Sequence, residues 1–154
     1  MTQIRKMPQQ VMIARYMLLG TVIATVVNFI LLLTDSDKYI PYSASVAYYL
    51  GYFGWLFDGA RRFGIFTAVG MTLAAFVLSV YVVSWVLAAK NLRWLQVGMW
   101  LVIADAAALV GLILLFRSNF MNFAWELALH GAVIYEMATG ISAWKKLTNE
   151  PEDG

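Results

Sequence analysis

Four long apolar runs, interrupted by very few ionisable residues, constrain this chain more than any other feature. A helix needs about 20 predominantly apolar residues to cross the hydrocarbon core of a bilayer, and each run is long enough. Helices are expected because lipid cannot satisfy the polar groups of an open backbone. The predicted spans cover about residues 11–34, 65–89, 94–116 and 121–143. The predicted fold class is therefore all-α, a bundle of four transmembrane helices.

Composition supports a membrane protein whose main partner is the lipid bilayer. Of the 154 residues 62% are hydrophobic and 13% are charged, whereas a soluble domain carries about 25% charged residues. The formal net charge of +2 is too small to indicate a nucleic-acid partner. The chain has no cysteine, which excludes disulfides, thiolate metal sites and thiol redox chemistry.

Positively charged residues predict the orientation of the spans. One side of the membrane would hold seven of them and the other side four: Arg5, Lys6, Arg15, Lys90, Arg93, Lys145 and Lys146 against Lys38, Arg61, Arg62 and Arg117. This excess predicts that both termini are cytoplasmic. We expect one domain over residues 1–147, followed by a disordered polar tail over residues 148–154.

The connection between the first two predicted spans contains an aromatic segment, residues 39–57. Ser43 is a start signal for a helix over about residues 44–57, and Gly51 and Gly54 predict that this helix is short or broken. Aromatic rings prefer the headgroup level of a bilayer, so we expect an interfacial helix that caps the bundle. The alternatives are a lid over an outward-facing cavity and a docking surface for a partner.

Small residues let membrane helices approach closely and so predict the packing faces. They recur at helical spacing in the first three spans as Gly20 and Ala24 with Asn28, as Ala68, Thr72, Ala75 and Ser79, and as Ala104, Ala107, Ala108 and Gly111.

Polar residues within the spans are the candidate functional residues, because an ionisable group there costs about 2.5–3.5 kcal/mol on insertion scales. Asp105 and His130 lie near the middle of the third and fourth spans. Glu126 is one turn outward of His130 on the same helix face. With Asn28 in the outer half of the first span, these four side chains could converge.

Glu136 does not share that face. At 100° per residue it points about 120° away from His130 and lies further inward. Arg15, just inside the first span, is its expected partner.

Three interpretations fit Asp105, Glu126 and His130. Two carboxylates and an imidazole could bind a divalent metal such as Zn²⁺, Mn²⁺ or Fe²⁺. The same side chains could bind or relay protons, since histidine titrates near neutral pH. In the simplest interpretation they hydrogen-bond one another and fix the register of the third and fourth helices.

No sequence motif indicates an enzyme. The chain has no glycine-rich phosphate loop, no Gly-x-Ser-x-Gly elbow and no His-Glu-x-x-His motif. Because no pair of nucleophile and base is visible either, the sequence favours a function other than catalysis.

Three stretches carry a resemblance to known proteins: LLLTDSDKYIPYSASVAYYL, IADAAALVGLILL and ELALHGAVIYEMATGISAWKKL. Together they resemble a group of small, uncharacterised four-span membrane proteins of Gram-positive bacteria, over most of the chain. The resemblance implies the same architecture and a location in the bacterial plasma membrane. It implies no activity and no site residues.

Two functions therefore remain open. The first is a membrane protein that binds a cation or a proton at Asp105, Glu126 and His130. One form of this hypothesis places the site within a homo-oligomer. The second is an accessory subunit that binds a larger membrane protein through its aromatic segment. The rings of Tyr48, Tyr49 and Trp55 would then make the contact.

Overall fold

The computed structural model describes residues 7–59, 62–116 and 120–149, and every regular element in these ranges is helical. The elements are α1 (Gln9–Leu33), α2 (Ser45–Phe57), α3 (Ile65–Leu87), α4 (Leu92–Leu115), a short 3₁₀-helix η1 (Phe120–Phe123) and α5 (Ala124–Asn149). The all-α prediction is thus confirmed, and so is an aromatic helix between the first two long helices. Predicted and observed ends agree to within a few residues, except that α5 continues well beyond residue 143.

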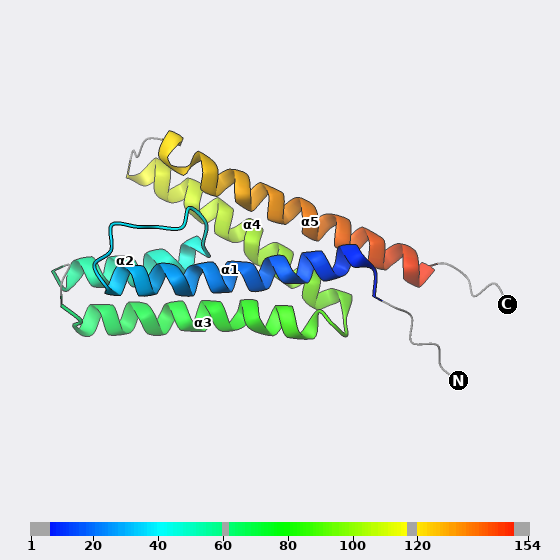
Figure 1. Cartoon of the computed structure of the whole chain (residues 1–154), viewed down its shortest axis with the longest axis horizontal. Helices are drawn as coiled ribbons and strands as arrows, with labels where there is room; N and C mark the ends of the chain where they lie inside the picture. Colours follow the sequence, from blue (N-terminus) through cyan, green and yellow to red (C-terminus); the bar gives the residue numbers. More distant parts are fainter. Residues whose placement is uncertain (1–6, 60–61, 117–119, 150–154) are drawn as a thin grey trace.

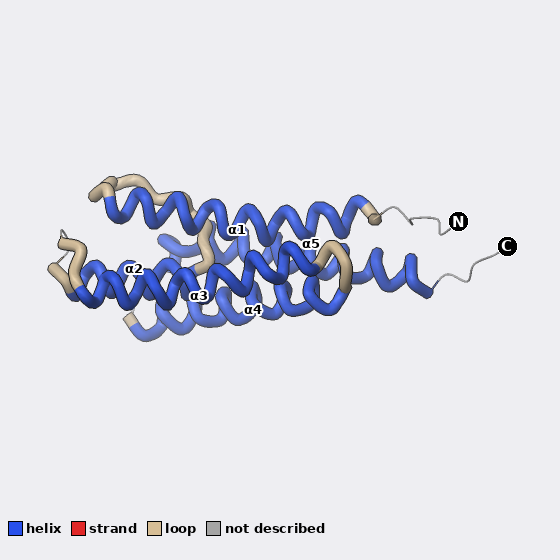
Figure 2. Tube along the Cα trace, turned by 90° about the horizontal axis from the view of Figure 1, so that it is seen from below, coloured by secondary structure: helices blue, strands red, loops and turns tan. Residues whose placement is uncertain are grey.

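Four long helices, α1, α3, α4 and α5, run side by side along the long axis of the molecule (Figure 1). The start of α1 and the end of α5 lie at the same end of this bundle. The short α2 lies in the opposite half. Figure 2 shows α2 lying beside α3, and these two helices make the most extensive contact between elements.

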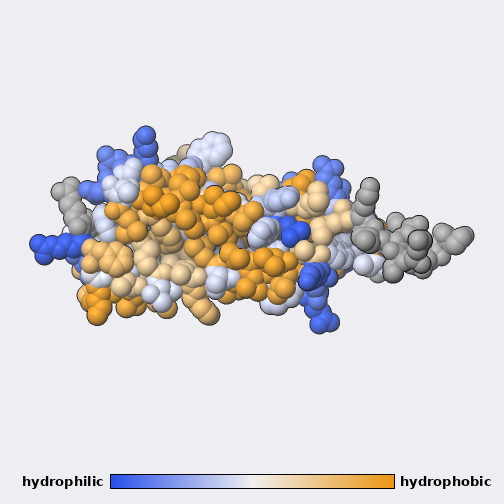
Figure 3. Space-filling model, turned by 60° about the horizontal axis from the view of Figure 1, so that its bottom comes forward, coloured by the Kyte–Doolittle hydropathy of each residue, from blue (hydrophilic) through white to orange (hydrophobic). Residues whose placement is uncertain are grey.

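Three of the helices, α1, α3 and α4, are long and apolar enough to cross a membrane, where the sequence predicts four spans. The fourth predicted span falls on α5, which is equally long but carries Glu126, His130 and Glu136 along its length. Large apolar side chains face outward, for example Phe76 (70% exposed) and Leu114 (72% exposed). In Figure 3 apolar surface covers the middle of the face and hydrophilic residues gather toward its ends, as contact with lipid requires.

The helix α2 begins in the interior of the bundle and not at its end. After Leu33 the chain turns back along the bundle, and α2 starts beside the middle of α4, where the Ser45 amide meets Asp105. From there α2 runs back to the end where α1 stops (Figure 1). We call residues 34–57 the re-entrant segment. We predicted an interfacial helix that caps the bundle, whereas α2 lies along the long helices; its level relative to a membrane stays a prediction.

Glycines explain how α2 fits against α3. A Cβ atom on Gly54 would meet the backbone carbonyl of Phe66, and one on Gly70 would meet the carbonyl of Leu50. The prediction that this helix is short or broken holds in its first form, because α2 has 13 residues but is continuous through Gly51 and Gly54, which allow close approach.

The turn into α3 is held by Asp58, which accepts hydrogen bonds from the Thr67 amide and hydroxyl, both at 2.6 Å, and from the Gly64 amide at 3.1 Å. It thereby supplies the cap that the first turn of a helix needs. The Thr67 hydroxyl bond is the main reason that the pKa of Asp58 lies below its ordinary value.

The predicted small-residue faces are wrong for the most part, because Asn28 alone of their residues is buried. Gly20 and Gly111 are exposed, and a Cβ atom on either would meet nothing within 4 Å. The α3 helix instead buries the following residues: Thr67, Gly70, Ala74, Leu78, Tyr81 and Ser84. Small residues are tolerated on a lipid-facing surface as well as in a contact, so their spacing does not identify the packed face.

The end of the chain also differs from the prediction. The α5 helix continues to Asn149, so residues 148 and 149 are helical and do not belong to a disordered tail. Residues 150–154 lie outside the described part of the chain, as do four of the residues used to predict orientation: Arg5, Lys6, Arg61 and Arg117.

Candidate functional site

Asp105 caps the buried start of α2. Its Oδ2 atom accepts the Ser45 amide at 2.6 Å, and its Oδ1 atom accepts the Val46 amide at 2.8 Å. These amides belong to the first turn of a helix, which has no acceptors of its own and carries a partial positive charge. Asp105 is 2% exposed and stands on the same face of α4 as buried Val102 and Leu109.

His130 joins this carboxylate from α5. Its Nε2 atom lies 2.9 Å from Asp105 Oδ2, and its Nδ1 atom lies 2.8 Å from the backbone oxygen of Glu126, one turn earlier. The Tyr42 ring closes over the imidazole with centroids 5.2 Å apart. Both ring nitrogens are therefore engaged by protein atoms in a fully buried position.

The partners of His130 determine how many hydrogens the pair holds. A carbonyl oxygen can only accept, so Nδ1 must carry a hydrogen. In a neutral imidazole Nε2 would then be an acceptor facing a carboxylate oxygen, which is also an acceptor. The 2.9 Å contact therefore requires one further proton, either on His130 or on Asp105.

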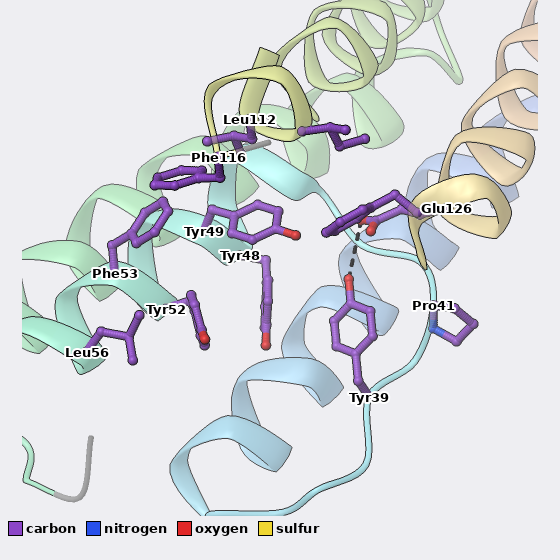
Figure 4. A pocket seen from close by; sticks show the side chains of 12 residues that line it. Tyr39, Pro41, Tyr48, Tyr49, Tyr52, Phe53, Leu56, Leu112, Phe116 and Glu126 are labelled. Atoms are coloured by element: carbon purple, nitrogen blue, oxygen red, sulfur yellow. Dashed lines mark hydrogen bonds between the residues drawn. The ribbon is translucent and has the colours of Figure 1, made fainter. Parts of the chain in front are cut away.

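Glu126 is turned toward the re-entrant segment. Its Oε1 atom accepts the hydroxyls of Ser45 at 2.9 Å, Tyr39 at 3.3 Å and Ser43 at 3.4 Å. Among the described residues none donates to Oε2. Glu126 is only 3% exposed and forms part of a cavity wall (Figure 4).

Polar residues of α1 hold the other side of the re-entrant segment. Asn28 accepts the Ile40 amide at 2.8 Å and donates to the carbonyls of Ile40 and Tyr42 at 3.0 and 3.3 Å. Thr25 accepts the Ala44 amide at 2.7 Å. An unpaired buried backbone group is costly, so these bonds are what permits an extended chain inside an apolar bundle.

The structure thus brings Asn28, Asp105, Glu126 and His130 to one region, a possibility that the sequence left open, and arranges them around a backbone segment. The Glu126 carboxylate accepts the hydroxyls of Ser43 and Ser45, and each oxygen of Asp105 accepts a backbone amide. In the ranges described, no three or more side chains of the His, Asp and Glu type form a group that could hold a metal ion.

The predicted pair of Arg15 and Glu136 is wrong. Arg15 donates through Nε to the backbone oxygen of Trp85 at 3.2 Å, which ties α1 to the end of α3. No ion pair joins Arg15 to Glu136, and both residues lie in the described part of the chain. The carbonyl of Trp85 near the end of a helix is a free acceptor, and it satisfies the guanidinium in place of the carboxylate.

An aromatic cavity of about 620 Å³ opens between α2 and the facing parts of α4, η1 and α5 (Figure 4). Tyr48 and Tyr49, two of the rings proposed above to bind a partner, stand in its wall. The third, Trp55, does not border it. The described lining residues are Tyr39, Pro41, Tyr48, Tyr49, Tyr52, Phe53, Leu56, Leu112, Ile113, Phe116, Phe123 and Glu126.

Several residues of the site were not predicted as functional. Ser45 and Thr25 are short polar residues, which are common in membrane helices, and Tyr39 was counted only as an interfacial ring. One signal was available, because Thr21, Thr25 and Asn28 recur on one helix face of an otherwise apolar run. Such a polar stripe indicates that something polar packs against it.

Neither a model of a known protein family nor a curated protein nor a solved structure matches this chain. The resemblance to four-span proteins of Gram-positive bacteria therefore stays a prediction, and the function is inferred from the site alone.

Proposed function

We propose that this protein binds a proton at the buried pair of Asp105 and His130, and that this proton holds the start of α2 inside the bundle. The observation that carries the proposal is the placement of the imidazole between two acceptors, the Glu126 carbonyl and the Asp105 carboxylate. Without the additional proton the lone pair of Nε2 would face the Asp105 carboxylate, and the carboxylate that caps α2 would lose its second support.

The hydrogen bonds that Asp105 and His130 already make favour proton binding over metal binding. Both nitrogens of His130 and both oxygens of Asp105 make hydrogen bonds within the protein. A metal ion needs ligand atoms whose lone pairs converge on one point. Here the lone pairs of Asp105 point to two backbone amides and to the proton shared with His130. Two tyrosines are near the pair: the Tyr42 ring of the re-entrant segment contacts the imidazole, and Tyr81 of α3 is close enough to Asp105 for an electrostatic interaction.

The protonation state can be observed directly, because His130 is the one histidine in the chain. Protein labelled with ¹⁵N-histidine would be reconstituted in lipid at neutral pH, and its ring nitrogens and the infrared carboxyl region would be recorded. We expect either hydrogens on both ring nitrogens or a protonated-carboxyl band that Asp105→Asn removes. In Asp105→Asn the amide can donate to Nε2, so the ring should be neutral with its hydrogen on Nδ1.

Glu136→Gln is the matched control, since Glu136 shares the helix and lies outside these contacts. It should leave both signals unchanged. A neutral imidazole in the wild type, with no carboxyl band that depends on Asp105, would overturn the proposal.

We also propose that the chain crosses a bacterial plasma membrane four times, with both termini cytoplasmic. The support is that α5 runs the length of the bundle beside α1 and α4, so that α1 starts and α5 ends at one side. Lys145 and Lys146 near the end of α5 agree with the cytoplasmic side.

Single cysteines test this topology, because the natural chain contains none. With a membrane-impermeant maleimide on intact cells, Ser36→Cys should be labelled and Thr148→Cys should react only after lysis. Labelling of Thr148→Cys in intact cells, together with labelling of Ser36→Cys, would mean that α5 does not cross.

A further inference from the structure

The aromatic cavity has a size and a form suited to a small molecule. Its volume of about 620 Å³ lies inside the range of about 300–1,000 Å³ that is common for ligand pockets. Figure 4 shows the rings of Tyr48, Tyr49, Tyr52 and Phe53 side by side along α2, facing the space that Glu126 borders from the other side.

Among the described lining residues, a single side chain can carry charge. Glu126 is the sole carboxylate of the described lining, and no lysine, arginine or histidine accompanies it there. Its Oε1 atom takes all three donated hydroxyls, and no described residue donates to Oε2. A buried carboxylate is costly unless a cation or further donors compensate it. A cation in the cavity would compensate this carboxylate.

The walls select the kind of cation. Aromatic faces attract a cation that lies within about 6 Å of the ring, and this attraction is strongest where water is excluded. Neighbouring rings form the wall: Tyr48 and Tyr52 are stacked with centroids 6.0 Å apart, and Tyr49 and Phe53 are tilted with centroids 5.9 Å apart. A small metal ion would have to take its oxygen ligands from the three hydroxyls that already donate to Glu126. A cation with a bulky apolar body uses both the rings and the carboxylate.

We propose that this cavity binds a monovalent organic cation, whose charge lies against Glu126 and whose apolar body lies against the tyrosines and Phe53 of α2. This inference does not rest on the proton at Asp105 and His130. The two proposals use different side chains, and His130 contacts only the backbone oxygen of Glu126.

Equilibrium binding of radiolabelled tetraphenylphosphonium to the detergent-purified protein tests the proposal, with uncharged triphenylphosphine oxide as competitor. We expect saturable binding that the neutral compound displaces poorly. Glu126→Gln keeps the length of the side chain and an acceptor for Ser45 but removes the charge, and it should lower the affinity at least tenfold. Glu136→Gln should bind like the wild type.

A second variant covers the case in which Glu126→Gln does not fold, as judged by a thermal melt. Tyr49→Leu leaves the three hydrogen bonds to Glu126 in place and removes one aromatic face. It should weaken binding of the cation severalfold and leave binding of the neutral compound nearly unchanged. Equal affinity of the wild type for the charged and neutral compounds would overturn the proposal and indicate an apolar or lipid-chain site. Cation binding that survives Glu126→Gln unchanged would overturn it as well.

Discussion

Replacing Asp105 by alanine should remove a large part of the stability of this protein. The change deprives three buried groups of their acceptor: the amides of Ser45 and Val46 and the Nε2 atom of His130. Each unsatisfied buried amide costs about 1–3 kcal/mol, and removal of one partner from a buried charged pair costs about 3–5 kcal/mol. These costs overlap, so we expect a loss of at least about 3–5 kcal/mol from a total that is about 5–15 kcal/mol in ordinary proteins.

Reversible unfolding in mixed micelles, followed by circular dichroism, measures this loss. Asp105→Asn keeps one acceptor oxygen and should lose less than Asp105→Ala. Asp37→Ala changes an exposed residue of the same type and should stay within about 0.5 kcal/mol of the wild type. If Asp105→Ala were as stable as Asp37→Ala, the carboxylate would not be holding α2, and the account of the re-entrant segment would be refuted.

Two further predictions concern the contact between α2 and α3. Gly54→Ala should destabilise the protein by about 1–3 kcal/mol, because the new Cβ meets the Phe66 carbonyl, which cannot rotate away. The control Gly111→Ala should be neutral or stabilising, since a Cβ there meets nothing within 4 Å. Equal melting curves of the two variants would contradict this prediction. Hydrogen bonds from Thr67 lower the pKa of Asp58 in the folded state. The Asp58 carboxylate therefore stabilises the fold at a pH above its ordinary pKa of about 4. This stabilisation is lost as the pH falls through the lowered pKa. Unfolding measured from pH 6 to pH 3 should therefore lose stability more steeply in the wild type than in Asp58→Asn, and parallel curves would contradict the assignment.

Much of the helical architecture was predictable because lipid imposes a simple rule. A run of apolar residues long enough to cross must be helical, and polar turns such as Asp35 to Lys38 end it. The direction of α2 was not predictable in the same way. Its aromatic residues suit the headgroup level and the interior of a bundle equally well, and only the acceptors offered by distant residues decide between the two.

The candidate site was found for one physical reason and missed for another. Asp105, Glu126 and His130 stand out because charge inside an apolar run is costly. Their partners do not stand out, because Asp105 binds backbone amides, and every residue except proline has one. A sequence can therefore indicate which side chains need a partner, while the partner itself depends on the path of the chain.

Ser45 connects the two proposed sites. Its amide donates to Asp105 at 2.6 Å and its hydroxyl donates to Glu126 at 2.9 Å, so a change at either carboxylate acts on the same residue. Coupling between two ligands is reciprocal, and a cation at Glu126 should alter the proton at His130 by the same free energy with which the proton alters cation binding. Saturating tetraphenylphosphonium should therefore shift the ¹⁵N signals of His130 in the wild type. Ser45→Ala keeps the amide bond and removes the hydroxyl, so it should preserve the His130 signals and abolish or reduce the shift. A wild-type spectrum that does not respond to bound cation would mean that the two sites act independently, because the residue that joins them would then transmit nothing.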